Sequence, residues 1–531
     1  MLLDYPNRKN ADFLIKGFKE GFRLGHFKDR VARIAPNLPS VQQHPEVIAS
    51  YINEELSKDR MLGPYSQPPI NDFIVSPLGC LPKKTPNKYR IIQHLSYPRK
   101  GSLHSVNEDI DPSYSKVHYQ SFQDFIECVS KFGPGAFAMK TDIDHAYKII
   151  PLSVKDFNLL GCQFKWMYFI DKTLPMGASS ASAIFEKFSS AIEWILQQQF
   201  KRQKIKAFVK HYMDDFIIIG QNYWACKQAM DLFKNLCTFL GIPLSPDKTS
   251  EFPVQAIEYL GLLVQIDQLK IFTPREKIEK ALSSINSILS STYVKAGELQ
   301  SLAGLLVFIS KTVPCGRAFI RRIYDVIASK HQSEKIKVSQ AIRLDVHVWE
   351  KFLSHHTGVN IIPDHSKQTP PSLILAGDAS FHGFGLMFQS HFAYNSWPSS
   401  FLKSSPHITL LELYAIAMGF LLFKHEMANK KVLVVSDNQA VVYLLSQKTT
   451  RCKRSLHLLR LIIMLSLTYN ITFISHWIPS SVNSGPDLLS RLKINEFMNK
   501  FGSQVDHHPT KVSDLLFPPS DRKFRLSYLN L

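Results

Sequence analysis

The stretch that decides the fold reads Phe208-Val-Lys-His-Tyr-Met-Asp-Asp-Phe-Ile-Ile-Ile-Gly220. Two apolar runs rich in β-forming residues flank the adjacent carboxylates Asp214 and Asp215, which predicts two strands joined by a tight hairpin turn. Two charges held beside buried strands are costly unless a cation meets them. Because hard oxygen ligands suit Mg²⁺, the hairpin predicts a divalent-metal site. The alternative for a bare Asp-Asp pair is a solvated turn.

The composition limits the class of protein. A chain of 531 residues is too long for one ordinary core, so roughly three or four domains are expected. A hydrophobic content of 45% and a charged content of 20% are typical of a soluble globular protein. The net charge of +19 favours a polyanionic partner, nucleic acid first of all, over a generically basic protein.

Cysteine usage and hydropathy favour an intracellular protein, in the cytoplasm, the nucleus or both. The seven cysteines include no Cys-x-x-Cys pair, which argues against a disulfide framework or a zinc cluster. The first residues lack the pattern of a signal peptide. The most apolar late stretch, 456–474, is interrupted by Arg460, Thr468 and Asn470, so a buried helix and strand are expected there rather than a membrane span.

A second carboxylate motif lies upstream of the hairpin, in Met139-Lys-Thr-Asp-Ile-Asp-His-Ala-Tyr-Lys-Ile-Ile-Pro151. Asp142 ends an apolar run, and an aspartate at the end of a strand can face across a sheet to the hairpin carboxylates. Two-metal phosphoryl transfer needs such carboxylates, because they hold two ions roughly 3.5–4 Å apart. Asp144, two residues further on, is more simply explained as a solvated surface charge.

Four more carboxylates follow in the last third of the chain, at the expected ends of strands and starts of helices. They are Asp378, Glu412, Asp437 and Asp487. Each alone has an ordinary explanation, since an aspartate can cap a helix and a glutamate can lie on the surface. Within one α/β unit, however, the four can converge on two Mg²⁺ ions.

Several stretches, in this order along the chain, resemble the motifs of reverse transcriptases. They are Leu81-Pro-Lys-Lys84 with Lys88-Tyr-Arg-Ile-Ile92, Asp142 with Tyr147, Leu174-Pro-Met-Gly-Ala-Ser-Ser-Ala-Ser-Ala-Ile-Phe185, Tyr212-Met-Asp-Asp215, Lys248 in Leu244-Ser-Pro-Asp-Lys-Thr249, and Tyr259-Leu-Gly-Leu262. Any one alone would be weak, but their order makes the resemblance specific. The later carboxylates resemble the Asp-Glu-Asp-Asp set of ribonuclease H.

The resemblance implies a role for each motif residue of the polymerase. Asp142 and Asp214 would ligate both metals and Asp215 would complete the site. Tyr147 would lie under the sugar and exclude a 2′-hydroxyl. The remaining nucleotide-binding candidates are Lys83 and Arg90 for the triphosphate, Met176 and Gly177 in the loop that supports the nucleotide, and Lys248 as a general acid toward pyrophosphate. Met176 departs from the family, because retroviral enzymes usually carry Gln there.

The ribonuclease H resemblance has one departure. The mobile histidine that many of these enzymes carry before the last aspartate is absent, and Ser480-Ser-Val482 occupies that stretch. His476 is expected on a strand with a structural role. Slower product release, rather than lost cleavage, is the expected consequence.

The expected fold class is therefore α/β and α+β multidomain: a right-hand polymerase with fingers, palm and thumb, followed by a ribonuclease H-like α/β domain. The predicted segments are an N-terminal helical extension (1–64), reverse transcriptase fingers and palm (65–268), thumb or connection helices (269–362), a linker (363–372), the ribonuclease H-like domain (373–497) and a C-terminal tail (498–531).

The implied function is that of an RNA-directed DNA polymerase and ribonuclease H, with two Mg²⁺ or Mn²⁺ ions per active site. Its partners would be an RNA template, a DNA primer, an RNA–DNA hybrid and dNTPs, with no membrane. The stretches Arg90-Ile-Ile-Gln-His-Leu-Ser-Tyr-Pro98 and 174–181 are most similar to DIRS-type retrotransposons, whose recombinase or integrase and capsid proteins would be separate chains. The alternatives are a pararetroviral or Gypsy-type polymerase, a non-catalytic nucleic-acid-binding descendant, and a plain metal-dependent nuclease.

Overall fold

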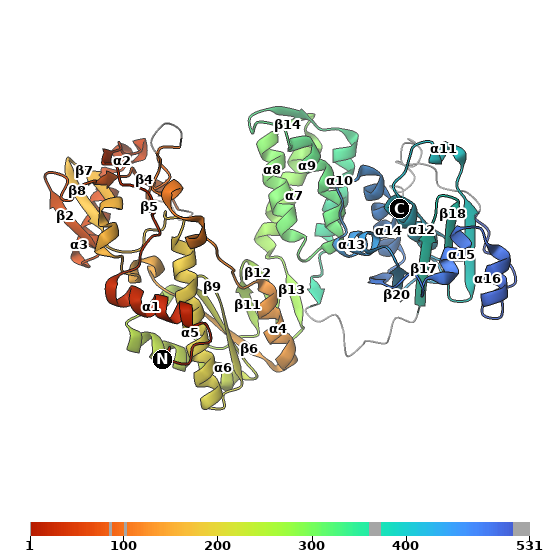
Figure 1. The fold of residues 1–531 in the computed structure, drawn as a ribbon, viewed down its shortest axis with the longest axis horizontal. Helices are drawn as coiled ribbons and strands as arrows, with labels where there is room; N and C mark the ends of the chain where they lie inside the picture. Colours follow the sequence, from red (N-terminus) through yellow and green to blue (C-terminus); the bar gives the residue numbers. More distant parts are fainter. Residues whose placement is uncertain (1, 84–87, 100–103, 361–372, 513–531) are drawn as a thin grey trace. The chain divides into compact units, whose positions relative to one another are not determined.

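The computed structural model describes residues 2–83, 88–99, 104–360 and 373–512 (Figure 1). The chain divides into two compact units, Met1–Leu269 and Lys270–Leu531. Both units mix helices and strands, which confirms the predicted α/β and α+β fold class. The finer predicted segments stay a prediction; the linker 363–372 and most of the tail, 513–531, lie outside the described residues.

A three-stranded antiparallel sheet carries the first candidate site. Its order is β6 (Phe137–Asp142), β10 (Asp215–Gly220) and β9 (Ala207–Tyr212). The central strand β10 begins at Asp215 and continues into four side chains with no exposed surface, 216–219. Such an unbroken apolar run is typical of a strand with neighbours on both sides. The helices that flank this sheet are α4 (Phe122–Phe132), α5 (Ala181–Arg202) and α6 (Tyr223–Leu240).

The rest of the first unit contains a mixed five-stranded sheet and two hairpins. The mixed sheet has the order β1 (Arg33–Ile34), β3 (Ile74–Val75), β7 (Gly161–Phe164), β8 (Met167–Asp171) and β2 (Met61–Tyr65). The hairpins pair β4 (Leu78–Pro82) with β5 (Tyr89–Gln93), and β11 (Ala256–Tyr259) with β12 (Leu262–Gln265). The N-terminal segment supplies α1 (Arg8–Glu20), α2 (Pro39–Gln43) and α3 (Pro45–Ser57). It also supplies β1 and β2, so it is not purely helical.

The second unit begins with a group of helices. They are α7 (Arg275–Ser290), α8 (Ala296–Ile309), the 3₁₀ helix η7 (Pro314–Phe319), α9 (Arg321–Ile327) and α10 (Gln340–Ser354). Two short strand pairs accompany them, β13 (Lys270–Phe272) with β16 (Val359–Asn360) and β14 (Tyr293–Lys295) with β15 (Lys335–Lys337). The apolar faces of the helices pack around Trp349, which is fully buried.

A five-stranded mixed sheet carries the second candidate site. Its order is β19 (His391–Ser396), β18 (Gly383–Phe388), β17 (Leu373–Ala379), β20 (Lys431–Ser436) and β21 (Thr472–Trp477). The first three strands are antiparallel, whereas β17, β20 and β21 run parallel. The accompanying helices are α11 (Ser399–Leu402), α12 (Ile408–Leu422), α13 (Gln439–Gln447), α14 (Lys453–Thr468), α15 (Ser484–Ser490) and α16 (Ile494–Phe501).

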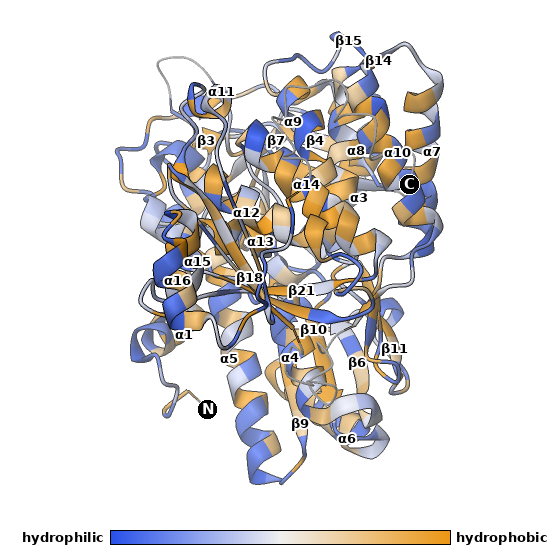
Figure 2. Cartoon of the chain, turned by 90° about the vertical axis from the view of Figure 1, so that its right-hand side faces the viewer, coloured by the Kyte–Doolittle hydropathy of each residue, from blue (hydrophilic) through white to orange (hydrophobic). Residues whose placement is uncertain are grey.

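Helix α12 lies at the centre of this α/β domain. Every residue from 410 to 420 is buried, because the helix packs against β17 and β18 on one side and α14 on the other. A helix that is apolar on all sides needs such cover. Figure 2 shows the hydrophobic colour concentrated on strands such as β18 and on much of α14. In the described part of the chain, no helix combines the length and the hydropathy needed to cross a membrane.

Two candidate active sites

The predicted hairpin at 208–220 closes with a two-residue turn. Asp215 pairs with Tyr212, so Met213 and Asp214 form the loop between β9 and β10. Met213 has a φ of +58°, a left-handed conformation that two-residue hairpins require and that side chains other than glycine rarely adopt. Two hydrogen bonds hold the turn: Ser189 Oγ donates to the Met213 carbonyl (2.8 Å), and the Ile143 amide donates to the Asp214 carbonyl (3.2 Å).

Asp142 lies directly opposite Asp215 on the adjoining strand, as the sequence predicts. Burial, followed by the charge of Asp142 and a hydrogen bond with it, raises the pKa of Asp215. Burial and the same neighbouring charge also raise the pKa of Asp214. Lys248 Nζ lies 2.9 Å from Asp142 Oδ2 and is the cation that meets this group of acids. Asp142, Asp214 and Asp215 interact with one another and offer hard oxygen donors to a divalent cation, but they do not bring one oxygen each within 4.8 Å of the others, as a compact group of described ligands would.

Lys248 reaches Asp142 because a loop is tied to the end of β6. The Ser245 amide donates to the Asp142 carbonyl (2.8 Å), and Leu244 bridges to Ile143. The 3₁₀ helix η6 (Pro246–Lys248) then presents the lysine. The hydrogen bond to Asp142 raises the pKa of Lys248, so the ammonium form is favoured.

The predicted nucleotide-binding residues occupy two parts of the first unit. Tyr147 is half-buried: its hydroxyl lies 3.2 Å from Ser182 Oγ and its ring packs 5.2 Å from that of Phe185. Lys83 directly follows β4 and Arg90 lies on β5, both exposed on one hairpin. The structure therefore places Tyr147 beside α5 and the two cations on a separate element.

The loop with Met176 and Gly177 is held by a residue that the sequence does not single out. Asn107 donates through Nδ2 to the Gly177 carbonyl (2.9 Å) and accepts through Oδ1 from the Ser179 amide (2.8 Å). A Cβ on Gly177 would lie 2.6 Å from the Gln93 carbonyl oxygen, so the close approach requires glycine there. Met176 is 65% exposed.

A buried charge network behind the hairpin is also absent from the sequence analysis. His211 has no exposed surface, and its ring nitrogens lie 2.5 Å from Glu193 Oε2 and 3.0 Å from Glu186 Oε1. Lys210 Nζ lies 2.9 Å from the other oxygen of Glu193. Although burial acts to lower it, hydrogen bonds to Glu186 and Glu193 raise the pKa of His211 to about 9. The ring is therefore an imidazolium that donates to both carboxylates of α5.

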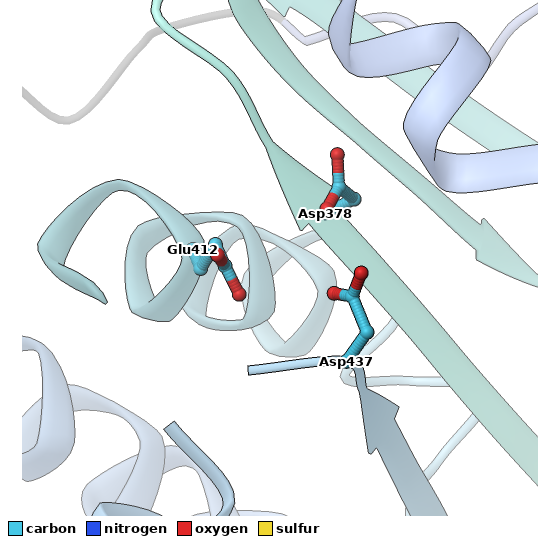
Figure 3. Close-up of side chains that lie close together, drawn as sticks. All are labelled: Asp378, Glu412 and Asp437. Atoms are coloured by element: carbon cyan, nitrogen blue, oxygen red, sulfur yellow. The ribbon is translucent and has the colours of Figure 1, made fainter. Parts of the chain in front are cut away.

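The second site gathers three of the four predicted carboxylates (Figure 3). Asp378 comes from β17, Glu412 from α12, and Asp437 directly follows β20. One oxygen of each lies within 4.8 Å of the others, and within the described residues this is the one such group of three or more possible metal ligands. Burial and the neighbouring acids raise the pKa of Glu412 to about 7 and that of Asp378 to about 6. The crowding and the donor set fit a divalent cation.

Asp487 lies outside this group of three. It is on α15, where its Oδ1 accepts from Arg491 Nε (2.8 Å), yet its charge still contributes to the raised pKa of Asp378. Ser490 connects the two, because its hydroxyl contacts Asp378 Oδ2 (2.6 Å) and the Asp487 carbonyl (2.9 Å). His476 lies on β21, as expected, and its side chain is exposed.

Neutral side chains orient the second group of acids. Asn438 donates through Nδ2 to Glu412 Oε1 (3.0 Å), and Ser436 Oγ donates to Oε2 (3.3 Å). Asn483 Nδ2 lies 3.4 Å from Asp437 Oδ1. These residues lie outside the motifs in the sequence. Asn438 alone carried a signal, since it adjoins a predicted ligand at the end of a predicted strand.

Comparison with known proteins assigns part of the chain. Residues 81–264 match the family model described as "Reverse transcriptase (RNA-dependent DNA polymerase)". These residues form a reverse transcriptase domain. The matched segment contains the Asp142 strand, the Asp214–Asp215 hairpin and the Lys248 loop.

Curated relatives of the chain include polyproteins of a transposon and of a virus, and a viral Protein P. The Pol polyprotein from transposon 297 of Drosophila melanogaster is 23% identical over 93% of this chain and 44% of its own length. The Gag-Pro-Pol polyprotein of Human T-cell leukemia virus 3 is 29% identical over 31% of the chain and 10% of its own length. Protein P of Duck hepatitis B virus is 23% identical over 36% of this chain and 23% of its own length. The chain spans less than half the length of each.

Solved structures similar to the chain include the foamy viral protease-reverse transcriptase. Its structure in complex with dsDNA is 16% identical in sequence and has a TM-score of 0.45. The match covers 90% of this chain and 95% of that chain. Its structure in complex with an RNA/DNA hybrid is 14% identical in sequence and has a TM-score of 0.47. The match covers 89% of this chain and 61% of that chain.

Proposed function

We propose that this chain is an RNA-directed DNA polymerase with a second, separate ribonuclease H site, and that it copies the RNA of a retroelement into DNA. The observation that carries the proposal is the pairing of Asp142 with Asp215 beside the Asp214 turn, inside the reverse transcriptase domain. Phosphoryl transfer by two metals needs carboxylates gathered in this way.

Both sites would use the same cofactor. When bound, two Mg²⁺ or Mn²⁺ ions per site would lower the pKa of the attacking hydroxyl or water and offset charge on the leaving oxygen. Asp142, Asp214 and Asp215 would hold them in the first unit. Asp378, Glu412, Asp437 and Asp487 would do so in the second, where Asp487 stays paired with Arg491 until a ligand competes.

The first site has residues suited to a primer, a template and a dNTP. The Lys248 ammonium would donate a proton to the leaving pyrophosphate; its contact with Asp142 keeps it protonated but raises its pKa, so that contact must loosen for the transfer. Tyr147, held between Ser182 and Phe185, presents a rigid surface to the sugar and would exclude a 2′-hydroxyl. Lys83 and Arg90 are exposed and can meet the triphosphate, and the Met176–Gly177 loop would support the nucleotide.

The second site would cleave the RNA strand of the hybrid that the first site produces. Asn438 and Ser436 fix the Glu412 carboxylate, and Ser490 fixes that of Asp378, so the acids are oriented before a substrate binds. The strand order of the five-stranded sheet supports this assignment, as do the acids on β17 and α12 and directly after β20.

The retroelement assignment rests on motif similarity and on the relatives. The stretches around 90–98 and 174–181 favour a DIRS-type element, and a retrotransposon Pol polyprotein is similar over nearly the whole chain. We propose that the chain acts inside the cell, in the cytoplasm or nucleus. A recombinase or integrase and capsid proteins of the element would be separate chains.

Two assays on the same preparation test the proposed function. Primer extension on an RNA template with dNTPs and Mg²⁺ should yield DNA, and an RNA–DNA hybrid should lose its RNA strand alone. Asp144→Asn is the matched control for the first site, because this aspartate is half exposed, two residues from Asp142. It should leave extension near the wild-type rate.

Each alternative function gives a different result in these assays. Template binding without extension or cleavage would indicate a non-catalytic descendant. Hybrid cleavage without extension would indicate a nuclease. Extension on DNA templates alone would contradict the RNA-directed assignment.

A further inference from the structure

A cavity of about 650 Å³ in the second unit belongs to neither candidate active site. It is bounded by the helical segment of α9 and α10, by α11 and by the first turns of α14, which are labelled in Figure 1. Val326, Ile342 and Leu456 give it an apolar lining. Its size is within the range of small-molecule sites, which are roughly 300–1,000 Å³.

Two arginines at this cavity share one buried aspartate. Arg460 Nη2 lies 2.7 Å from Asp345 Oδ2, and Arg322 Nη1 lies 3.1 Å from Oδ1. The side chains of Asp345 and Arg460 are only 3% and 8% exposed. One carboxylate cannot neutralise two guanidinium groups, so a positive charge remains at this cluster, in which Asp345 and Arg460 are buried and Arg322 is partly exposed. Burial and the neighbouring Arg322 accordingly act to lower the pKa of Arg460.

The cavity rim adds to this positive charge. Arg454 contacts Ser404 Oγ (3.1 Å), and the adjacent Lys453 is exposed. The other acid at the cavity, Asp325, is already paired with Arg321 (2.8 Å). The lining carries three arginines, one lysine and Asp325; with Arg321 and Asp345, which pair with lining residues from behind, three positive charges remain around the cavity.

We propose that this cavity, which we call the Arg322–Arg460 pocket, is a binding site for a phosphate-bearing nucleotide unit. Planar guanidinium groups and an ammonium match phosphate oxygens, and the apolar lining suits a base or a sugar. The unit can come from a free nucleotide or from a single strand of nucleic acid. The inference is independent of the proposed polymerase function.

Cys452 provides a local reporter for the pocket. It is exposed and directly precedes Lys453, whereas five other cysteines are buried and Cys315 is partly buried. The rate of Cys452 alkylation by iodoacetamide can be followed in the full chain by peptide mass spectrometry. The probes are inorganic pyrophosphate, dTMP and a short oligothymidylate, with EDTA present so that metal ions do not attract the probes to the carboxylate sites.

Phosphate-bearing probes should slow alkylation of Cys452 in the wild-type chain. The variant Lys453→Gln with Arg454→Gln should need about tenfold more probe, because two charge-assisted contacts are removed. Lys453→Gln alone, which leaves the Arg454–Ser404 contact intact, should give a smaller shift in the same direction. The control Lys430→Gln with Lys511→Gln removes the same charge from exposed positions away from the pocket and should behave as wild type.

The outcomes separate the sources of the ligand. Protection by dTMP indicates a free nucleotide, and protection by the oligonucleotide but not by dTMP indicates a nucleic-acid strand; either supports the pocket. The proposal is overturned by no protection from any probe at millimolar concentration. It is equally overturned if the control variant loses protection, or if poly-glutamate protects and phosphates do not, since that would indicate an acidic peptide.

Discussion

The two groups of acids tolerate their crowding in different ways. In the first unit a lysine meets the carboxylates, with Lys248 Nζ 2.9 Å from Asp142. In the second unit, the described hydrogen bonds to Asp378 and Glu412 come from neutral hydroxyl and amide groups. A cation in contact offsets like charges directly, whereas neutral donors favour the ionised form more weakly, and the cation of the second unit, Arg491, is paired with Asp487 outside the group of three. The second group should therefore depend more strongly on a bound cation and on pH.

The largest expected effect tests whether the two groups are separate sites. Asp142→Asn should lower primer extension by several orders of magnitude and leave hybrid cleavage near normal, because a misplaced metal loses most of the barrier reduction. Asp437→Asn should do the reverse. Both rates are measured on each folded variant. Loss of both activities from either substitution would contradict the two-site assignment.

The buried network behind the first site is expected to give the next largest effect. His211→Gln removes the imidazolium between Glu186 and Glu193 and leaves their charges buried, which should cost about 3–5 kcal/mol in the free energy of unfolding. Because β9 leads directly into the Met213–Asp214 turn, primer extension should fall while hybrid cleavage persists. Denaturant unfolding measures the lost free energy of unfolding, and the two assays measure primer extension and hybrid cleavage.

The pH dependence of this network has a definite sign. The folded pKa of His211, about 9, is above its usual value of 6.5, so its stabilising contribution is complete below pH 6.5 and is lost as pH rises through 9. His118→Gln is the control, since His118 is exposed.

Adding Glu186→Gln to His211→Gln should restore part of the stability, because one buried charge is removed. No recovery would show that the loss is one of packing.

Local pattern was enough to predict which acids lie at the ends of strands and in the hairpin turn, but not what surrounds them. The hairpin and Asp142 follow from strand-like runs that end in carboxylates, a signal contained in a few consecutive residues. The partners of His211 lie on α5, 18 and 25 positions earlier in the sequence. Nothing in the α5 pattern indicates which strand it covers. The same holds for Ser490, which meets Asp378 only once α15 has packed against β17 and β18.

Metal and proton should compete at the second group of acids. The pKa of Glu412, about 7, is above its usual 4.5, so the metal-free unit loses stability from this group as pH rises from 4.5 to 7. A cation needs the ionised form, so its affinity should fall about tenfold for each pH unit below 7. The gain in melting temperature on adding Mg²⁺ should therefore be larger at pH 8 than at pH 6. Glu412→Gln should remove most of this difference, and an unchanged difference would exclude Glu412 as the titrating group.

The smallest expected effect concerns the loop that supports the nucleotide in the first unit. Asn107→Ala removes the contacts to Gly177 and Ser179, each worth about 1 kcal/mol, and should raise the KM for dNTP several-fold with little change in kcat. Asn107→Asp keeps the oxygen that accepts from Ser179 but loses the donor to Gly177, so its KM should be intermediate. Hybrid cleavage serves as the internal control, because the second group of acids makes no use of this loop. An equal fall in kcat for both variants, with KM unchanged, would show that Asn107 supports the catalytic carboxylates rather than the nucleotide loop.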